Sequence, residues 1–358
     1  MPYEAREVEC AVRLASNENP RNVPPEIMKK LARGVSSFDF NRYPDPMANK
    51  LRELIAEANG LEPANVLIGN GGDELIFNMF MAWGGPGRSV VDLPPTFAMY
   101  EIDAQVTGTG YHPIARCDDF SIDEVRFLER VGSRADDIVV GSNPNNPTGT
   151  IAPETVLIDA LNATDAIVLV DEAYFEFSRT TMRPHLGRHD NLVILRTFSK
   201  AFSLAGMRVG YLLAHEEVVE ELTKVRQPYS VDAFSQMVAR LVFRERAVFE
   251  TTINEVIRNR DRLLEALTAM DGVEAFPSEA NFILLRVANA SAVWRDLLHE
   301  HSVLIRDLSR GEGLTDCLRV TVGTEAENAR FLSGLADVLG RGQAAEGAAE
   351  RARRGEAR

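Results

Sequence analysis

The fold is decided by residues 166–200, AIVLVDEAYFEFSRTTMRPHLGRHDNLVILRTFSK, in which two short apolar runs are each followed by polar residues. The runs AIVLV (166–170) and LVIL (192–195) are continuous in apolar character and rich in β-branched side chains. Runs of this length and composition are typical of strands in a parallel sheet that is covered on both faces. The stretch therefore predicts two buried strands of such a sheet.

The same pattern recurs upstream, with helical patterns between the apolar runs. Further strands are predicted at VLI (66–68), SVVDL (89–93) and IVV (138–140). Residues 47–59 place apolar side chains at helical spacing and stop at Gly60, and Ser121 followed by Glu124 predicts a capping box that opens a helix. This alternation indicates an α/β fold with a mostly parallel, doubly wound sheet.

The character of the chain changes after about residue 230. Residues 232–270 look mostly helical, and short strand-like and helix-like patterns then alternate up to residue 339, which predicts a smaller α+β domain. The last residues contain almost no large apolar side chain. The predicted organisation is an N-terminal segment (1–40) that packs with the smaller domain and with a partner subunit, a large domain (41–235), a small domain (236–340) and a disordered tail (341–358).

Composition and charge narrow the class of protein. The net charge of −14 and the isoelectric point near 5.0 repel phosphate backbones, so we expect no nucleic-acid partner. No apolar run reaches the roughly 20 residues that span a bilayer, and the N-terminus lacks a signal-peptide pattern. The three cysteines, Cys10, Cys117 and Cys317, have no zinc-site spacing and suit a reducing cytoplasm, so we expect no metal and a cytoplasmic location.

Polar segments follow the predicted strands, where an open α/β sheet binds its ligands. They are GNGGDE (69–74), SNPNNPTG (142–149), DEAYFEF (171–177) and the TFSK turn (197–200). The glycines of the first segment permit close backbone approach and precede a helix, which suits an anion site or a plain turn. We expect the four segments to meet along one edge of the sheet.

Three residues of these segments carry candidate chemistry. Lys200 would be a solvated surface charge by default, but Arg208 and several small residues follow it, and a nearby cation lowers the pKa of a lysine and favours its reaction with an aldehyde. Asp171 could cap or pair with a neighbour, or could hold a protonated pyridine nitrogen. Tyr174 could be a core tyrosine or a hydrogen-bond donor to a ligand.

The motifs together resemble the fold-type I pyridoxal 5′-phosphate (PLP) aminotransferases, and most closely their histidinol-phosphate aminotransferase branch. The resemblance spans about residues 14 to 335. It rests on the four segments above together with LASNENP (14–20), RYPDP (42–46), PPTFAMY (94–100), AFSLAGMRVG (201–210) and LRVTVGT (318–324).

The resemblance implies PLP as the cofactor and assigns a role to single residues. Lys200 would bond covalently to the cofactor and later act as a general base, and Asp171 would pair with the ring nitrogen. The ring hydroxyl would be bound by Asn146 and Tyr174, and Phe97 would stack on the ring. The phosphate would be held by Gly71, Gly72, Asp73, Ser199 and Arg208.

The resemblance also implies a homodimer with shared active sites, in which Tyr43 reaches the partner subunit's cofactor and the substrate. Arg319 would anchor the acidic group of the substrate, with Arg306 and Asn146 as further contacts, although by position alone the two arginines could form surface ion pairs. The implied reaction moves an amino group from a small-molecule donor to a 2-oxo acid, most simply from histidinol phosphate to 2-oxoglutarate.

Other activities stay open at this point. The segment before LASNENP is shorter than in the histidinol-phosphate branch, and the two arginines suit a carboxylate as well as a phosphate. The donor could therefore be an aromatic or another amino acid. A relative of this fold decarboxylates threonine phosphate, and a non-catalytic binding protein is a further class. A nicotinamide oxidoreductase would need a glycine fingerprint that the sequence lacks.

Overall fold

In the computed structural model of the chain, which describes residues 8–133 and 137–353, the protein divides into two compact units. The large unit comprises Arg21–Glu255 with Ser278–Ala280, and the small unit comprises the other described residues. These limits differ from the predicted domain limits after residues 40 and 235. One long helix, α10 (Glu250–Thr268), continues through residue 255, and no break in its apolar pattern marks the change of unit.

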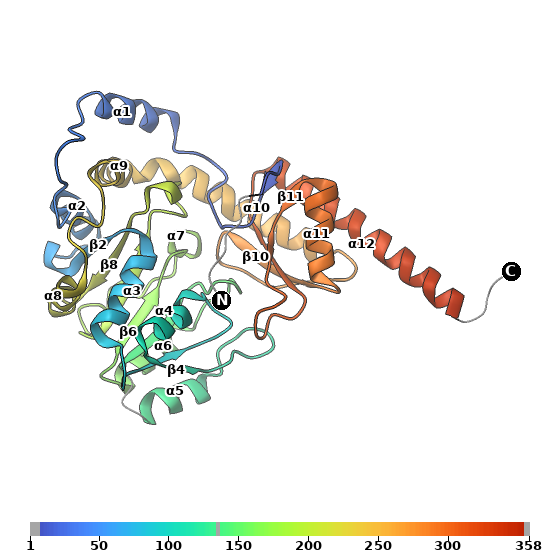
Figure 1. The fold of residues 1–358 in the computed structure, drawn as a ribbon, viewed down its shortest axis with the longest axis horizontal. Helices are drawn as coiled ribbons and strands as arrows, with labels where there is room; N and C mark the ends of the chain where they lie inside the picture. The colour runs from blue at the N-terminus through green and yellow to red at the C-terminus, as the bar shows by residue number, and fades with distance from the viewer. Residues whose placement is uncertain (1–7, 134–136, 354–358) are drawn as a thin grey trace. The chain divides into compact units, whose positions relative to one another are not determined.

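The large unit is built on a sheet of seven strands in the order β2-β8-β7-β6-β5-β3-β4 (Figure 1). The strands are β2 (Val66–Gly69), β3 (Ser89–Asp92), β4 (Gly110–Pro113), β5 (Ile138–Ser142), β6 (Ile167–Asp171), β7 (Leu192–Thr197) and β8 (Gly210–Ala214). Strand β8 runs in the direction opposite to that of the other six strands, which are parallel to one another. The five predicted strands are confirmed, whereas β4 and β8 were not predicted.

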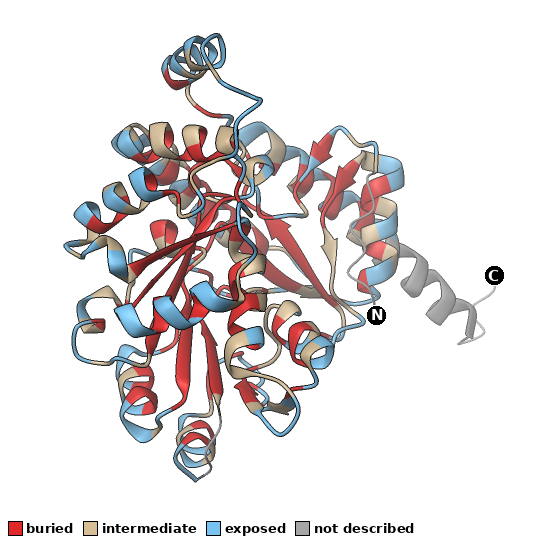
Figure 2. Ribbon diagram, turned by 60° about the vertical axis from the view of Figure 1, so that its left-hand side comes forward, coloured by how far each residue is buried: buried red, intermediate tan, exposed pale blue. Residues whose placement is uncertain are grey.

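Helices cover both faces of this sheet, as its buried strands require (Figure 2). The large unit contains α1 (Pro25–Val35), α2 (Asn49–Asn59), α3 (Gly71–Trp83), α4 (Met99–Thr107), α5 (Glu124–Ser133), α6 (Glu154–Ala163), α7 (Phe175–Ser178), α8 (Glu216–Val225) and α9 (Ala233–Arg244). Short 3₁₀ turns lie at Pro63–Asn65, Arg183–His185, Ala205–Met207 and Arg246–Phe249. The predicted α/β class is thereby confirmed.

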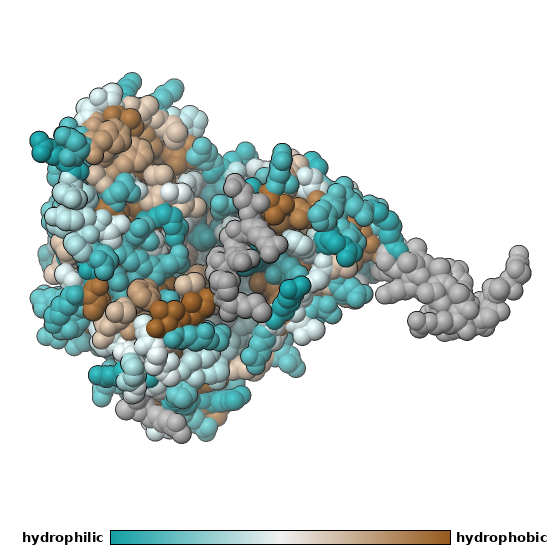
Figure 3. Space-filling view, viewed as in Figure 1, coloured by the Kyte–Doolittle hydropathy of each residue, from teal (hydrophilic) through white to brown (hydrophobic). Residues whose placement is uncertain are grey.

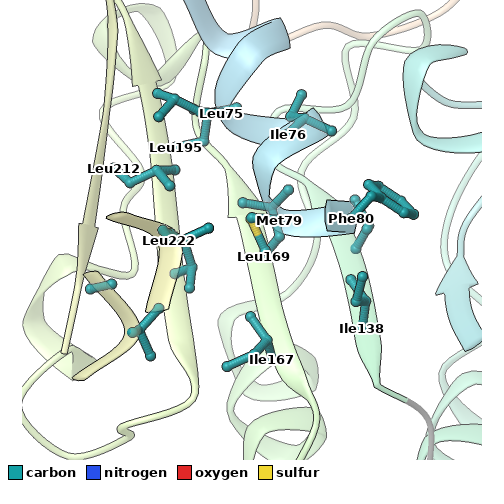
Figure 4. Packing of buried hydrophobic residues seen from close by; sticks show 14 of the residues in the cluster. Leu75, Ile76, Met79, Phe80, Ile138, Ile167, Leu169, Leu195, Leu212 and Leu222 are labelled. Carbon is teal, nitrogen blue, oxygen red and sulfur yellow. The ribbon is translucent and has the colours of Figure 1, made fainter. Parts of the chain in front are cut away.

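The core of the large unit forms where α3, α4 and α8 pack on one face of the sheet (Figure 4). Leu75, Met79 and Phe80 of α3 lie against strand residues such as Leu169 and Ile138, and all five are at most 1% exposed. Alternate strand positions point to the other face, where a side chain at Gly141 would touch Leu157 of α6. Burial of both faces explains why the strand sequences are continuously apolar.

The helix boundaries show where local sequence signals hold. Helix α2 ends at Gly60, which adopts the left-handed conformation with φ of 60°, as predicted from the sequence. The predicted capping box at Ser121 is wrong, because the Ser121 hydroxyl donates to Asp119. The carboxylate of Asp123 instead accepts the backbone N–H of Arg126 at 3.1 Å, so Asp123 caps α5.

The small unit has the α+β composition expected from its sequence. An antiparallel sheet has the order β12-β13-β10-β9, and a parallel pair joins β1 to β11. The strands are β1 (Val12–Arg13), β9 (Val273–Ala275), β10 (Phe282–Val287), β11 (Val303–Leu304), β12 (Arg306–Asp307) and β13 (Cys317–Thr321), and the helices besides α10 are α11 (Ala290–His301) and α12 (Glu325–Arg353).

The end of the chain differs from the predicted tail. Helix α12 continues through residue 341 to Arg353, because alanine, glutamate and arginine favour a helix. Residues 354–358 of the predicted tail lie outside the described residues, as do residues 1–7 of the predicted N-terminal segment. Within the described ranges, no helix is both long and apolar enough to cross a membrane.

Candidate active site

The predicted polar segments converge where the strands of the large sheet end. Ser142 and Asp171 are Cα partners at the ends of β5 and β6. Gly210 pairs with Thr197 at the end of β7 and with Gly69 at the end of β2. Register alone therefore places the four segments in one row, as the sequence predicted.

Asp171 is a buried carboxylate held by two donors. The Tyr100 hydroxyl donates to Asp171 Oδ2 at 2.6 Å, and the backbone N–H of Ala173 donates to Oδ1 at 2.9 Å. Burial raises the pKa of Asp171 to about 6, although both hydrogen bonds oppose that shift. None of the described lysine, arginine or histidine side chains forms an ion pair with Asp171, whose oxygens are bound by the two hydrogen bonds above.

Lys200 lies in the turn after β7, beside Tyr174. Its Nζ atom is 5.9 Å from the centroid of the Tyr174 ring, so the predicted lysine and tyrosine come together. Tyr174 is 4% exposed, whereas Lys200 is only partly buried. A half-buried amine at the end of a strand suits a group that reacts with a ligand above the sheet. The predicted effect of Arg208 on the pKa of Lys200 stays a prediction.

The SNPNNPTG segment forms a rigid loop that presents Asn146. Asn145, fully buried, donates to the Pro95 carbonyl at 2.9 Å and to the Thr148 hydroxyl at 2.8 Å, and it accepts from the Thr96 hydroxyl at 2.7 Å. Within residues 141–149, Asn146 alone is not buried. The buried Asn143, which accepts from the backbone N–H of Ala152 at 3.0 Å, and Asn145 thus anchor the loop, whereas Asn146 is the candidate ligand contact.

The GNGGDE segment and the loop after β7 form a cradle around the start of α3. Gly71 has a φ of 80°, and a side chain there would lie 2.7 Å from Arg208 Nη2. A side chain at Gly210 would lie 2.8 Å from the carbonyl carbon of Gly71. Arg208 also donates to the Ser199 hydroxyl at 3.4 Å. Backbone N–H groups at a helix start, a hydroxyl and a guanidinium are the donors that bind phosphate.

Two members of the predicted phosphate site have other contacts. The Asp73 carboxylate pairs with Arg208 at 2.8 Å, so the backbone of Asp73, and not its side chain, is the group suited to an anion. Gly72 packs against Leu195, whose Cδ2 would be 3.4 Å from an added side chain. Both residues nevertheless lie at the first turn of α3.

Phe97 contacts the ring of Tyr100, and the hydroxyl of Tyr100 in turn binds Asp171. The two rings are 5.7 Å apart and nearly perpendicular, at 84°. Phe97 is partly exposed and packs against the core of the large unit. No role for Tyr100 was predicted from the sequence, although it lies only three residues after Phe97, in the first turn of α4.

The other three predicted site residues, Tyr43, Arg306 and Arg319, are distant in sequence from the strand-end segments. Tyr43, in the large unit, is 83% exposed and stacks on Tyr229 with ring centroids 4.9 Å apart. Arg306 and Arg319, in the small unit, are Cα partners on neighbouring strands. Arg319 is 8% exposed and donates to the Ala15 carbonyl at 2.9 Å, so it is a buried arginine and not a surface one.

The large-unit site fits PLP on three observations. A Cβ at Gly71 would clash with the Arg208 guanidinium, so the glycine lets this phosphate-binding group lie against the start of α3. The buried Asp171 carboxylate suits a protonated ring nitrogen. The amine of Lys200, in the turn after β7, suits covalent attachment to the cofactor aldehyde.

Comparison with known proteins identifies the family of the chain. Residues 10–335 match the family described as aminotransferase class I and II. The chain is 40% identical over 338 residues to histidinol-phosphate aminotransferase 1 of Carboxydothermus hydrogenoformans, covering 94% of this chain and 96% of that protein.

Two solved structures are similar as well. Histidinol-phosphate aminotransferase from Sinorhizobium meliloti, solved in complex with pyridoxal 5′-phosphate, has a TM-score of 0.84 and 25% identity, and the match covers 92% of this chain and 91% of that one. L-threonine-O-3-phosphate decarboxylase from Porphyromonas gingivalis has a TM-score of 0.80 and 27% identity, with 92% and 99% covered.

Proposed function

The chain belongs to the class I and II aminotransferases, and from this membership we propose that it transfers the amino group of histidinol phosphate to 2-oxoglutarate, giving imidazole acetol phosphate and glutamate. The expected enzyme class and the PLP cofactor are confirmed by the family. An aminotransferase acts on a small-molecule amino donor and a keto acid, so both expected substrate classes are confirmed at that level.

The observation that supports a phosphate-bearing donor is that Arg306 and Arg319 lie directly opposite each other on the neighbouring strands β12 and β13. Directly opposed residues on antiparallel strands place their side chains on one face, where two like charges repel each other. Two guanidinium groups on one face can both donate hydrogen bonds to an anionic group of the substrate, such as a phosphate dianion. The relatives named as histidinol-phosphate aminotransferases support the same donor.

The residues of the large unit would divide the chemistry among them. PLP, when bound, supplies an electron-withdrawing ring that stabilises negative charge on the carbon bearing the amino group. Asp171 would hold the ring nitrogen as a cation, and Asn146 and Tyr174 would orient the ring through its hydroxyl. Lys200 would anchor the cofactor, and its amine, once released, would take the proton from the substrate carbon.

Substrate tests on the purified holoenzyme distinguish the candidate donors. Histidinol phosphate, phenylalanine, glutamate and threonine phosphate are each added alone, and conversion of the cofactor to its amine form is followed by absorbance. We expect the fastest conversion with histidinol phosphate and glutamate. Release of CO₂ from threonine phosphate, or fastest conversion with phenylalanine, would contradict the proposed donor.

Variants of the two arginines sharpen that test. Arg306→Gln and Arg319→Gln should raise the KM for histidinol phosphate, since each removes a hydrogen-bonded charge worth about tenfold or more in binding. Arg286→Gln is the matched control, because Arg286 also lies in the small sheet but pairs with Glu274. Equal effects of all three changes on KM would count against a substrate role for the arginine pair.

We further propose that the protein acts in the cytoplasm as a homodimer, to whose shared sites Tyr43 contributes. Phe40 and Tyr43 are 72% and 83% exposed, and Figure 3 shows hydrophobic side chains gathered beside α1. Exposed aromatic side chains in one segment are typical of an interface. Sedimentation of the wild type should give a dimer, and Tyr43→Ala should lower cofactor affinity; a monomer with full activity would contradict the shared site.

A further inference from the structure

Tyr100 is a buried tyrosine whose hydroxyl contacts the carboxylate at the centre of the site. It lies on α4, has no exposed surface, and donates to Asp171 Oδ2 at 2.6 Å. Hydrogen bonds from a hydroxyl to an ionised oxygen typically measure 2.5–2.7 Å, so this contact is of the strong, charge-assisted kind. The ring of Tyr100 packs in the core of the large unit, whereas its hydroxyl contacts a carboxylate, that of Asp171.

Tyr100 is the one described side chain that hydrogen-bonds to Asp171. The second donor is the backbone N–H of Ala173, which binds the other carboxylate oxygen. The charged groups that act most on Asp171 are Asp73 and Glu172, and both disfavour its ionised form. Burial does the same, and the Tyr100 hydroxyl is the largest influence in the opposite direction.

The hydroxyl also fixes the orientation of the carboxylate. A carboxylate bound at Oδ1 by the backbone alone could rotate its second oxygen, whereas donors on both oxygens hold one rotamer. Each oxygen keeps a further lone pair for a cation above the strand end. Together with the backbone N–H of Ala173, the Tyr100 hydroxyl thus favours both the orientation and the charge that a ring nitrogen needs.

We propose that Tyr100 is a positioning residue for the amino transfer: its hydroxyl holds the Asp171 carboxylate ionised and in the orientation that keeps the cofactor ring nitrogen protonated. The inference rests on the proposed role of Asp171. It adds a residue that does not itself touch the cofactor and whose loss should lower kcat more than it raises KM.

Tyr111 offers a matched control in the same unit. Its hydroxyl donates to Asp92 Oδ2 at 2.8 Å, and Asp92 is also fully buried with its pKa raised to about 6. Tyr111→Phe removes a hydrogen bond of the same type from a carboxylate outside the site. Tyr100→Phe keeps the buried ring, so differences between the two variants report on the hydroxyl at Asp171.

The test compares holoenzyme of the wild type, Tyr100→Phe and Tyr111→Phe with glutamate as donor. For Tyr100→Phe we expect kcat to fall about 10- to 100-fold, the range for a lost hydrogen bond to a charged group, while Tyr111→Phe keeps wild-type kcat. The acid limb of the pH–rate profile should move to higher pH in Tyr100→Phe alone. Unchanged kcat in Tyr100→Phe, or equal losses in both variants, would overturn the proposal.

A second readout does not depend on turnover. In apoprotein labelled with ¹³C at aspartate carboxyls, the Asp171 signal, assigned with Asp171→Asn, should titrate at higher pH in Tyr100→Phe than in the wild type. An unchanged titration would overturn the proposal even if activity fell. If the wild type catalysed no amino transfer, the proposed function would fail, whereas this titration would still report on the contact between Tyr100 and Asp171.

Discussion

Two tyrosine–aspartate pairs lie buried in the large unit, and they differ in what balances the carboxylate. In both pairs the tyrosine hydroxyl donates to the aspartate and burial raises the pKa of the carboxyl to about 6. Asp92 has the guanidinium of Arg116 nearby, which lowers its pKa. Asp171 has two further carboxylates as its charged neighbours.

The difference supports the proposed roles of the two residues: Asp92 as a structural carboxylate and Asp171 as one that binds a ligand. The protein supplies a cation to Asp92, and Arg116 is fixed by hydrogen bonds to the carbonyls of Leu93 and Phe120. At Asp171 the chain supplies hydrogen bonds and no ion pair among the described residues, so the ionised form costs free energy until a cation arrives. A pyridinium nitrogen is such a cation, which is why the PLP family fits this strand end.

The largest expected effect is on turnover. Asp171→Asn should lower kcat about 10²–10³-fold, because it removes a preorganised charge that acts on the transition state. Asp92→Asn, in which the changed side chain lies in the structural pair, should keep kcat close to that of the wild type. Steady-state rates of both holoenzymes with glutamate as donor measure this. Near-native turnover in Asp171→Asn would contradict the proposed difference between the two carboxylates.

The next effect concerns the free energy of unfolding. Arg116→Met removes the guanidinium that favours the ionised form of Asp92 and leaves the buried carbonyls of Leu93 and Phe120 without its hydrogen bonds, which should cost about 1–3 kcal/mol. Urea denaturation should show that loss, with kcat unchanged. Arg179→Met is the control, because its ion pair with Glu250 is exposed and should contribute only about 0.2–1 kcal/mol. Equal losses in the two variants would mean that Arg116 does not stabilise Asp92.

The smallest effect is a change in how stability depends on pH. Burial raises the pKa of Asp171 from 3.8 to about 6, so between these values the folded apoprotein binds a proton that the unfolded chain has lost. This contribution to stability is largest below pH 3.8 and is lost as the pH rises through 6. A shift of about two units corresponds to at most about 3 kcal/mol.

Asp171→Asn removes that titration from the apoprotein. We expect the variant to be more stable than the wild type by about 1–3 kcal/mol at pH 7.5, and by less at pH 5. Asp92→Asn should gain less, because the loss of the carboxylate leaves Arg116 without its attraction. Denaturant titrations at the two pH values measure the free energy of unfolding of both variants. Equal increases in Asp171→Asn and Asp92→Asn would show that Arg116 does not make the two carboxylates different.

Most of the fold could be predicted from the sequence because the strands of the large sheet are buried on both faces. Five of its seven strands were predicted from their continuous apolar runs, and the alternation of these strands with helices indicates the fold class. Strand β4 was missed because GYHP (110–113) lies at the sheet edge and has no buried residue. Strand β8 was missed because its apolar run, GYLLA (210–214), begins at the last residue of the AFSLAGMRVG motif (201–210), which was assigned to a loop.

Most of the site could be predicted from strand ends, whereas its supporting contacts could not. Lys200, Tyr174 and Asp171 follow strands directly, so topology alone brings them together. Tyr100 comes from a helix whose packing on the sheet is set by tertiary contacts, and no local pattern joins it to Asp171. The pairing of Asp73 with Arg208 spans 135 residues and is equally invisible to spacing.

The covalent attachment of the cofactor to Lys200 tests the central claim most directly. The holoenzyme is reduced with borohydride, digested and mapped by mass spectrometry, with Lys200→Ala treated in the same way. The account predicts one modified peptide, which carries the reduced cofactor on Lys200, and none in the variant. Modification of another lysine in the wild type, or none at all, would contradict the account.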